Sequence, residues 1–125
     1  MPSVLRDRLY EAARDYLPDS FRSPERTPLL ADPVRFLEQA GRSDRPFPWF
    51  FAASGTRDPV LDDTRRLAAA IEALGGDIET HIYPGEVHSF HAFLWRSQAK
   101  ELWRDWLGEM ERQVSQFEPL ELLAA

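Results

Sequence analysis

The middle of the chain alternates between apolar runs and helical periodicity, which predicts a strand, a helix and a second strand. Residues 47–53 are almost uninterrupted in apolar and aromatic side chains, as in a strand that is buried on both faces, with Pro48 near its first residue. A helix that ends before Gly75-Gly76 is expected next, because four apolar side chains recur on one face: Leu67, Ala70, Ile71 and Leu74. Residues 78–83 then alternate between apolar and polar side chains, as a second strand should, and Pro84-Gly85 ends them.

The flanking segments predict helices and a proline-rich connection. An amphipathic helix is expected over residues 4–17, followed by an irregular connection over residues 18–33 and a short helix over residues 34–37. A long helix follows the second strand, and its apolar stripe, which predicts a large contact with the sheet, comprises Trp95, Ala99, Leu102, Trp103, Trp106 and Met110. We expect a single partial domain over residues 1–125. It would consist of a helical, cap-like connection (1–46), a strand-helix-strand-helix unit (47–117) and a tail (118–125) that is frayed or docked.

Two chemically suggestive residues, Asp58 and His88, follow the two predicted strands. In a strand, crossover helix and strand of one sheet, the strands are parallel and the crossover is right-handed, so both following loops emerge at the same edge. Ligand sites in parallel α/β sheets lie outside this carboxyl edge. The sequence therefore predicts an α/β fold in which a carboxylate and an imidazole lie within hydrogen-bonding reach.

Composition narrows the classes of function. The net charge of −6 and the lack of a basic stripe argue against a nucleic-acid partner or an anionic membrane surface. The chain has no cysteine, so it has no disulfide framework, thiolate nucleophile or cysteine metal site. Because the first residues become charged too early for a signal peptide and no apolar stretch is long enough for a membrane span, we expect a cytoplasmic protein.

Two segments carry a resemblance to a known family: residues 55–63, GTRDPVLDD, and residues 83–90, YPGEVHSF. The chain resembles the C-terminal βαβα portion of an α/β-hydrolase, in the hormone-sensitive-lipase-like branch of carboxylesterases, over roughly residues 17–107. Residues 27–32 resemble the connection that leads out of the family's cap region. The resemblance implies that Asp58 and His88 are the acid and base of a Ser-His-Asp triad, with a small ester as substrate and no metal or organic cofactor. One departure is Ser89, where the family more often has Gly.

The nucleophile that this chemistry requires is missing. No Gly-x-Ser-x-Gly pentapeptide and no His-Gly-Gly stretch occur in the sequence, and in chain order the family's serine precedes its acid and base. We therefore expect a chain that supplies acid and base but is inactive alone, as a truncated gene product or one half of a split enzyme.

Simpler interpretations remain for each of these residues. An Asp-Pro after a strand is often only a turn, and Ser54 and Ser89 suit turn or cap roles better than nucleophilic ones. His81 is expected to be an ordinary residue of the sheet, and His91 is expected to make a packing contact. A metal site at His88-x-x-His91 is disfavoured, because no third ligand has suitable spacing.

Asp62 or Asp63 is the expected N-cap of the crossover helix. Because two strands do not make a stable open sheet, we expect its free edge to be covered, either by further strands once encoded upstream or by a second copy or a partner chain. The alternative function is then a non-catalytic interaction module that assembles through this strand edge and the aromatic helix.

Overall fold

The structure is a computed structural model that describes residues 3–21, 23 and 25–116. The described residues divide into two compact units, with the boundary between His88 and Ser89. The predicted tail, residues 118–125, lies outside the described residues. No helix within the described ranges is both long and apolar enough to cross a membrane.

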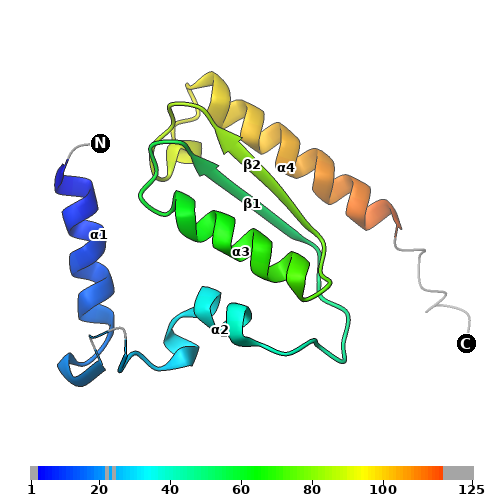
Figure 1. Ribbon diagram of the computed structural model, residues 1–125. Coiled ribbons are helices and arrows are strands. Elements are labelled where there is room, and N and C mark those ends of the chain that lie inside the picture. Colours follow the sequence, from blue (N-terminus) through cyan, green and yellow to red (C-terminus); the bar gives the residue numbers. More distant parts are fainter. Residues whose placement is uncertain (1–2, 22, 24, 117–125) are drawn as a thin grey trace, which may run out of the picture. The chain divides into compact units, whose positions relative to one another are not determined.

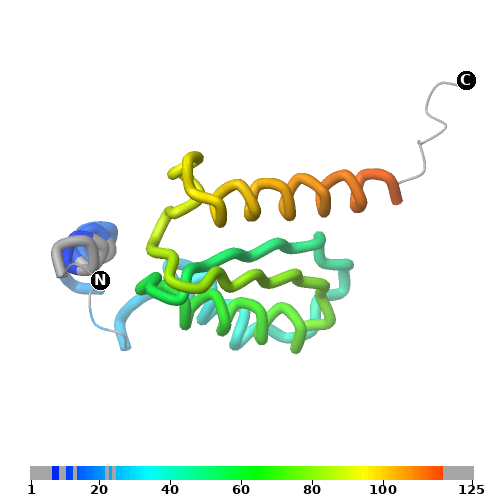
Figure 2. Tube along the Cα trace, turned by 90° about the horizontal axis from the view of Figure 1, so that it is seen from above, coloured from blue at the N-terminus to red at the C-terminus, as the bar shows by residue number. Residues whose placement is uncertain are grey.

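A parallel pair of strands forms the centre of the first unit (Figure 1). Strand β1 (Phe50–Gly55) pairs with β2 (Ile78–Tyr83) in a register that runs from Phe50 opposite Ile78 to Gly55 opposite Tyr83. Helix α3 (Leu61–Ala73) connects the strands and packs against both, as a layer along them in Figure 2. The predicted parallel βαβ unit is therefore confirmed, and the second strand has the predicted bounds.

Two local predictions in this unit are wrong. The first strand begins at Phe50 rather than at residue 47, because its ladder begins where the Phe50 N–H donates to the carbonyl of Asp77, at 3.0 Å. The N-cap of α3 is Val60, and Asp62 and Asp63 lie in the first turn. There they still complement the positive end of the helix dipole.

Helix α3 buries one face and ends at a glycine pair. Ile71 is fully buried, and Ala70 and Leu74 are nearly so, which accounts for the predicted apolar stripe. Gly75 has a φ of +82°, and its N–H donates to the carbonyl of Glu72 at 3.0 Å. The N–H of Gly76 donates to the carbonyl of Ile71 at 2.9 Å, so the two bonds form a Schellman motif that turns the chain into β2.

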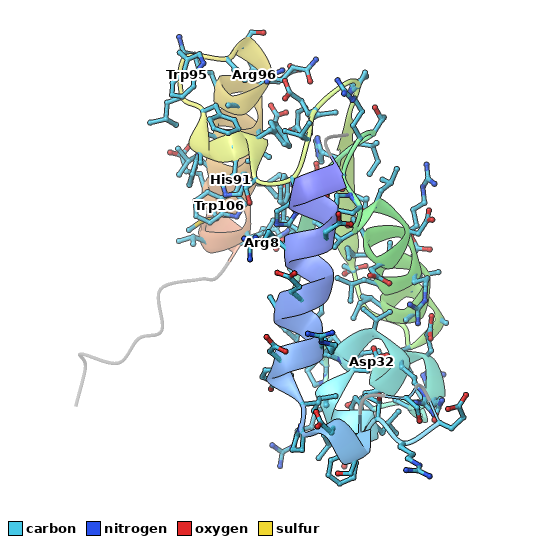
Figure 3. The ribbon with its side chains drawn as sticks, turned by 90° about the vertical axis from the view of Figure 1, so that its left-hand side faces the viewer. Arg8, Asp32, His91, Trp95, Arg96 and Trp106 are labelled. Atoms are coloured by element: carbon cyan, nitrogen blue, oxygen red, sulfur yellow. The ribbon has the colours of Figure 1, made fainter. Side chains whose placement is uncertain are left out.

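The segment before β1 contains α1 (Ser3–Tyr16), two short 3-10 turns, η1 (Asp19–Phe21) and η2 (Leu29–Ala31), and α2 (Pro33–Gln39). The opening helix, the irregular connection and the short helix are thus confirmed. Asp32, labelled in Figure 3, is the N-cap of α2. Its carboxylate accepts from the Arg35 N–H at 3.0 Å, and Pro33 is the first residue of the helix.

Helix α2 packs against α3, where an ion pair joins the two helices. Glu38 accepts from Arg66 at two points, Nε at 2.7 Å and Nη2 at 2.8 Å. These hydrogen bonds lower the pKa of the Glu38 carboxyl below its usual value, and they raise the pKa of the Arg66 guanidinium further. The pair ties the segment before β1 to the crossover helix.

The second unit contains the 3-10 turn η3 (Phe90–Ala92) and the long helix α4 (Ser97–Gln116). The predicted tryptophan stripe is only partly correct. Trp95 precedes the helix and is 77% exposed (Figure 3), and Trp103 is 37% exposed, whereas Ala99 and Leu102 are buried. The helix begins at Ser97, so the spacing that included Trp95 extended the helical periodicity into a turn.

Candidate functional site

The loops that follow β1 and β2 are joined by backbone hydrogen bonds. The N–H of Thr56 donates to the carbonyl of Tyr83 at 3.0 Å, and the N–H of Arg57 donates to the carbonyl of Glu86 at 2.9 Å. Gly55 permits this approach, because a Cβ at that position would lie 2.1 Å from the Glu86 carbonyl oxygen. The two loops therefore form one structural element at the carboxyl edge of the sheet.

A tight turn shapes the second loop. Pro84 and Gly85 occupy the two central positions, Gly85 has a φ of +76°, and the N–H of Glu86 reaches back to the Tyr83 carbonyl at 3.4 Å. Proline followed by a left-handed glycine is the pattern of a type II turn. The hydroxyl of Thr56 accepts from the Gly85 N–H at 2.8 Å, which attaches the turn to the first loop.

Asp58 is held by its own loop. Its Oδ1 accepts from the Val60 N–H at 3.0 Å, and its backbone N–H donates to the carbonyl of Gly55 at 3.0 Å. This is the turn-forming role expected of an aspartate before proline, and it also aims the carboxylate. The side chain is only 7% exposed, so the carboxylate is largely shielded from water.

His88 lies against this carboxylate. Its Nδ1 is 3.1 Å from Oδ1 and 3.2 Å from Oδ2 of Asp58, across a sequence separation of 30 residues. The prediction that the two side chains lie within hydrogen-bonding distance is confirmed.

The contact determines the protonation pattern of the imidazole. An ionised carboxylate can only accept, so Nδ1 carries the proton and donates it. The Nε2 atom of neutral His88 is then a proton acceptor, and the ring is 32% exposed. A carboxylate that orients an imidazole with an available Nε2 has the chemistry of a general acid-base pair.

Neither serine near the pair has the surroundings of a nucleophile. Ser54 is 2% exposed and lies within β1 rather than in a turn or cap, so that prediction is wrong for Ser54. Its Oγ makes no hydrogen bond within the part of the chain that the structure describes. Ser89 lies in the turn before η3, with a left-handed φ of 57° and no side-chain capping bond.

The other two histidines have structural contacts. The His81 Nε2 lies 2.7 Å from Glu79 Oε1, and the ring stacks on Phe51 at 5.1 Å between centroids. His91 contacts the Trp103 ring, and its carbonyl accepts from the Trp103 Nε1 at 3.0 Å. Across residues 3–21, 23 and 25–116, no group of three or more His, Cys, Asp or Glu side chains is arranged to hold a metal.

Three residues that build the site had no role predicted from the sequence: Gly55, Thr56 and Glu86. Glu86 is 3% exposed, and its carbonyl receives the Arg57 N–H. A glycine directly after an apolar strand could have signalled a close approach of two backbones. No comparable signal marks Thr56 or Glu86 in the sequence, because their roles depend on a loop about 30 residues away.

A parallel strand-helix-strand unit with a carboxylate and an imidazole at its carboxyl edge is a partial α/β fold. A family model described as the alpha/beta hydrolase fold matches residues 2–92. The match spans most of the chain, and the chain therefore belongs to this family. No curated protein and no solved structure matches it.

Proposed function

We propose that this chain is the C-terminal part of a carboxylic-ester hydrolase of the hormone-sensitive-lipase-like branch, and that it forms a single partial domain. Asp58 is the triad acid, His88 is the triad base, and the nucleophilic serine is not part of this sequence. The observation that carries the proposal is the contact of 3.1 Å between His88 Nδ1 and the shielded Asp58 carboxylate. A cytoplasmic location remains a prediction of the sequence.

The proposed chemistry is acyl transfer in two steps. His88 Nε2 accepts the proton of the serine hydroxyl as the oxygen attacks the ester carbonyl, and the imidazolium then gives that proton to the leaving alcohol. Asp58 holds the ring in the tautomer that leaves Nε2 available, and it stabilises the imidazolium while it exists. Water then attacks the carbonyl of the acyl-enzyme, with His88 again as the base, and the imidazolium returns the proton to the serine oxygen.

The missing parts define what the isolated chain lacks. Without the serine, catalysis typically falls by a factor on the order of a million. Without an oxyanion hole, the residual factor of about a thousand to ten thousand over water, which that hole and substrate binding supply, is lost as well. The proposal therefore expects almost no ester hydrolysis from this chain until a second segment supplies both elements.

The backbone of β1 supports completion by another strand. The N–H groups of Phe50 and Thr56 donate toward β2, so those of Phe51 and Ala53, on the alternate positions, face the opposite edge. The described residues form only a two-stranded sheet, which leaves that edge available to a complementing chain.

The direct test measures hydrolysis of a short-chain nitrophenyl ester by the purified chain, with His88→Ala as the matched control. We expect both proteins to hydrolyse the ester at the uncatalysed rate. Hydrolysis that disappears in His88→Ala would show that the chain contains a nucleophile and would contradict the proposal. Nucleotides directly upstream of the coding region provide a second test, because the proposal expects an in-frame Gly-x-Ser-x-Gly there.

A separate experiment tests the roles of Asp58 and His88. Imidazole ¹⁵N NMR should find the proton of neutral His88 on Nδ1 and should find it shifted toward Nε2 in Asp58→Ala. An unchanged tautomer in the variant would remove Asp58 from its proposed role.

The open edge also favours the second candidate, a non-catalytic interaction module. Light scattering after size-exclusion chromatography, with Ala53→Pro as the variant, separates the two functions. Proline at this position removes an N–H on the open edge and leaves the ladder to β2 in place. A stable oligomer that this variant dissociates, without ester hydrolysis, would favour the module, whereas aggregation of the isolated chain would favour an incomplete enzyme.

A further inference from the structure

An apolar row lies on the exposed side of α4, in addition to the residues that the helix buries. Its members are all substantially exposed: Trp103 (37%), Leu107 (49%), Met110 (38%) and Val114 (65%). Their spacings of four, three and four residues place them on a single stripe with the period of a coiled-coil seam. The second half of the row lines a shallow apolar depression that is also bordered by Glu111 and Ser115.

Two side chains of opposite charge flank the row, one near each end of it. Arg104 directly follows Trp103, and Glu111 directly follows Met110, so both are at the same position of the heptad. The Arg104 side chain is 74% exposed and only loosely paired, with Asp105 Oδ1 at 3.4 Å and Glu101 Oε1 at 3.9 Å. In coiled coils, charges at this flanking position select the partner and its orientation.

We propose that this α4 row is a docking surface for a second copy of the same chain, in an antiparallel helix pair. In this register Trp103 lies opposite Val114 of the partner subunit, and Leu107 lies opposite Met110 of the partner subunit. Each large side chain then faces a smaller or more flexible one, as close packing requires. The contact is isologous, so a twofold axis repeats every interaction.

The charges favour the antiparallel orientation. Arg104 faces Glu111 of the partner subunit, and the twofold axis forms this ion pair twice. A parallel pair would place Trp103 against Trp103 of the partner subunit and would keep Arg104 about two helical turns from Glu111 of the partner subunit. Only the antiparallel register brings the two charges together.

The size of the row sets the expected strength of the dimer. It spans about 17 Å at a helical rise of 1.5 Å per residue. Such a contact buries less than the roughly 800 Å² per partner of a standard stable interface. The dimer should therefore be weak and dependent on concentration, with a dissociation constant on the order of 10 to 100 μM.

The test is sedimentation equilibrium of the full chain and of two charge variants, over concentrations that bracket this dissociation constant. Arg104→Glu places two acidic side chains against each other in its own dimer, and Glu111→Arg places two basic ones. Each variant alone should bind itself about tenfold more weakly than the unchanged chain. An equimolar mixture of the two variants should recover the original affinity, because both cross-pairs are then of opposite sign.

Control variants separate this contact from others. Arg65→Glu makes the same change in net charge at an exposed position of α3, and it should leave association unchanged. Leu107→Glu, in the centre of the row, should abolish it. Because Arg104 and Glu111 are exposed, their variants should keep the helix, which circular dichroism can check.

Three results would overturn the proposal. The first is a monomer at every concentration, and the second is a dimer that both charge reversals leave intact, such as one formed through the edge of β1. The third is a mixture of the variants that associates no better than each variant alone. The esterase proposal is independent of all three, because its tests measure ester hydrolysis and the His88 tautomer.

Discussion

Replacing Gly55 with alanine perturbs the closest approach between the two site loops. A Cβ at this position would lie 2.1 Å from the carbonyl oxygen of Glu86, 2.4 Å from its carbonyl carbon and 2.9 Å from its Cβ. Two of these three atoms belong to the backbone, so no side-chain rotation relieves the overlap. Because Cβ contacts under 3.0 Å essentially do not occur, the loops must separate by about 1 Å.

Separating the loops lowers the free energy of unfolding. The hydrogen bond from the Arg57 N–H to the Glu86 carbonyl, at 2.9 Å, would pass out of range. Overpacking typically costs about 1–3 kcal/mol, and a lost hydrogen bond costs about 1 kcal/mol more. We expect Gly55→Ala to reduce the free energy of unfolding by roughly 2–4 kcal/mol, a large part of a typical total of about 5–15 kcal/mol.

The same displacement should weaken the contact between Asp58 and His88, because each of these residues is carried by one of the two loops that separate. Urea unfolding measures the loss of stability, and ¹⁵N NMR of the His88 imidazole measures the proton on Nδ1. In the variant we expect a lower urea midpoint and a shift of the imidazole proton toward Nε2.

Gly41→Ala provides the matched control, because a Cβ there meets nothing within 4 Å. The control should unfold at or slightly above the midpoint of the unchanged chain. If Gly55→Ala matched the control in both stability and tautomer, the two loops would not be in close contact at Gly55, and this contact would not hold Asp58 against His88.

Three smaller changes test other parts of the structure. The hydrogen bonds from Arg66 lower the pKa of Glu38 in the folded state. The pair therefore stabilises the fold at a pH above the pKa of Glu38 in the unfolded state, and this stabilisation is lost as the pH falls through the pKa of Glu38 in the folded state. Glu38→Gln should therefore lower the urea midpoint at neutral pH, and its effect should disappear once the pH has fallen well below the folded-state pKa of Glu38. Gly108→Ala should raise the free energy of unfolding by about 0.5–1 kcal/mol, because the glycine is inside α4 and its Cβ would meet nothing; a thermal midpoint that does not rise would contradict this. Thr56→Val removes the acceptor of the Gly85 N–H and should cost about 1 kcal/mol, with faster amide exchange at Gly85 as the direct measurement.

Local sequence signals predicted those parts of the fold that depend on local physics. Alternation over residues 78–83 predicted β2 with its observed bounds, and the apolar stripe before Gly75-Gly76 predicted α3. The signals failed where a boundary depends on a distant partner. Apolar composition extended the first strand back to residue 47, but the ladder with β2 begins only at Phe50.

The helix start shows the same limit. Asp62 and Asp63 are good N-caps by residue type, yet Asp58 already turns the chain and accepts the Val60 N–H, so α3 begins before either of them. In the second unit, periodicity placed Trp95 on the apolar stripe of a helix that begins only at Ser97. Residue type alone did not distinguish a turn from the first turn of a helix.

The order of strand, helix and strand along the chain was enough to place Asp58 and His88 at one edge of the sheet, because the crossover between parallel strands is right-handed. The close approach of the two loops, with Gly55 against the Glu86 backbone, and the exposure of the α4 side chains could be read only from the folded structure. Those features depend on distances between segments that are far apart in the chain, and periodicity and composition carry no information about such distances.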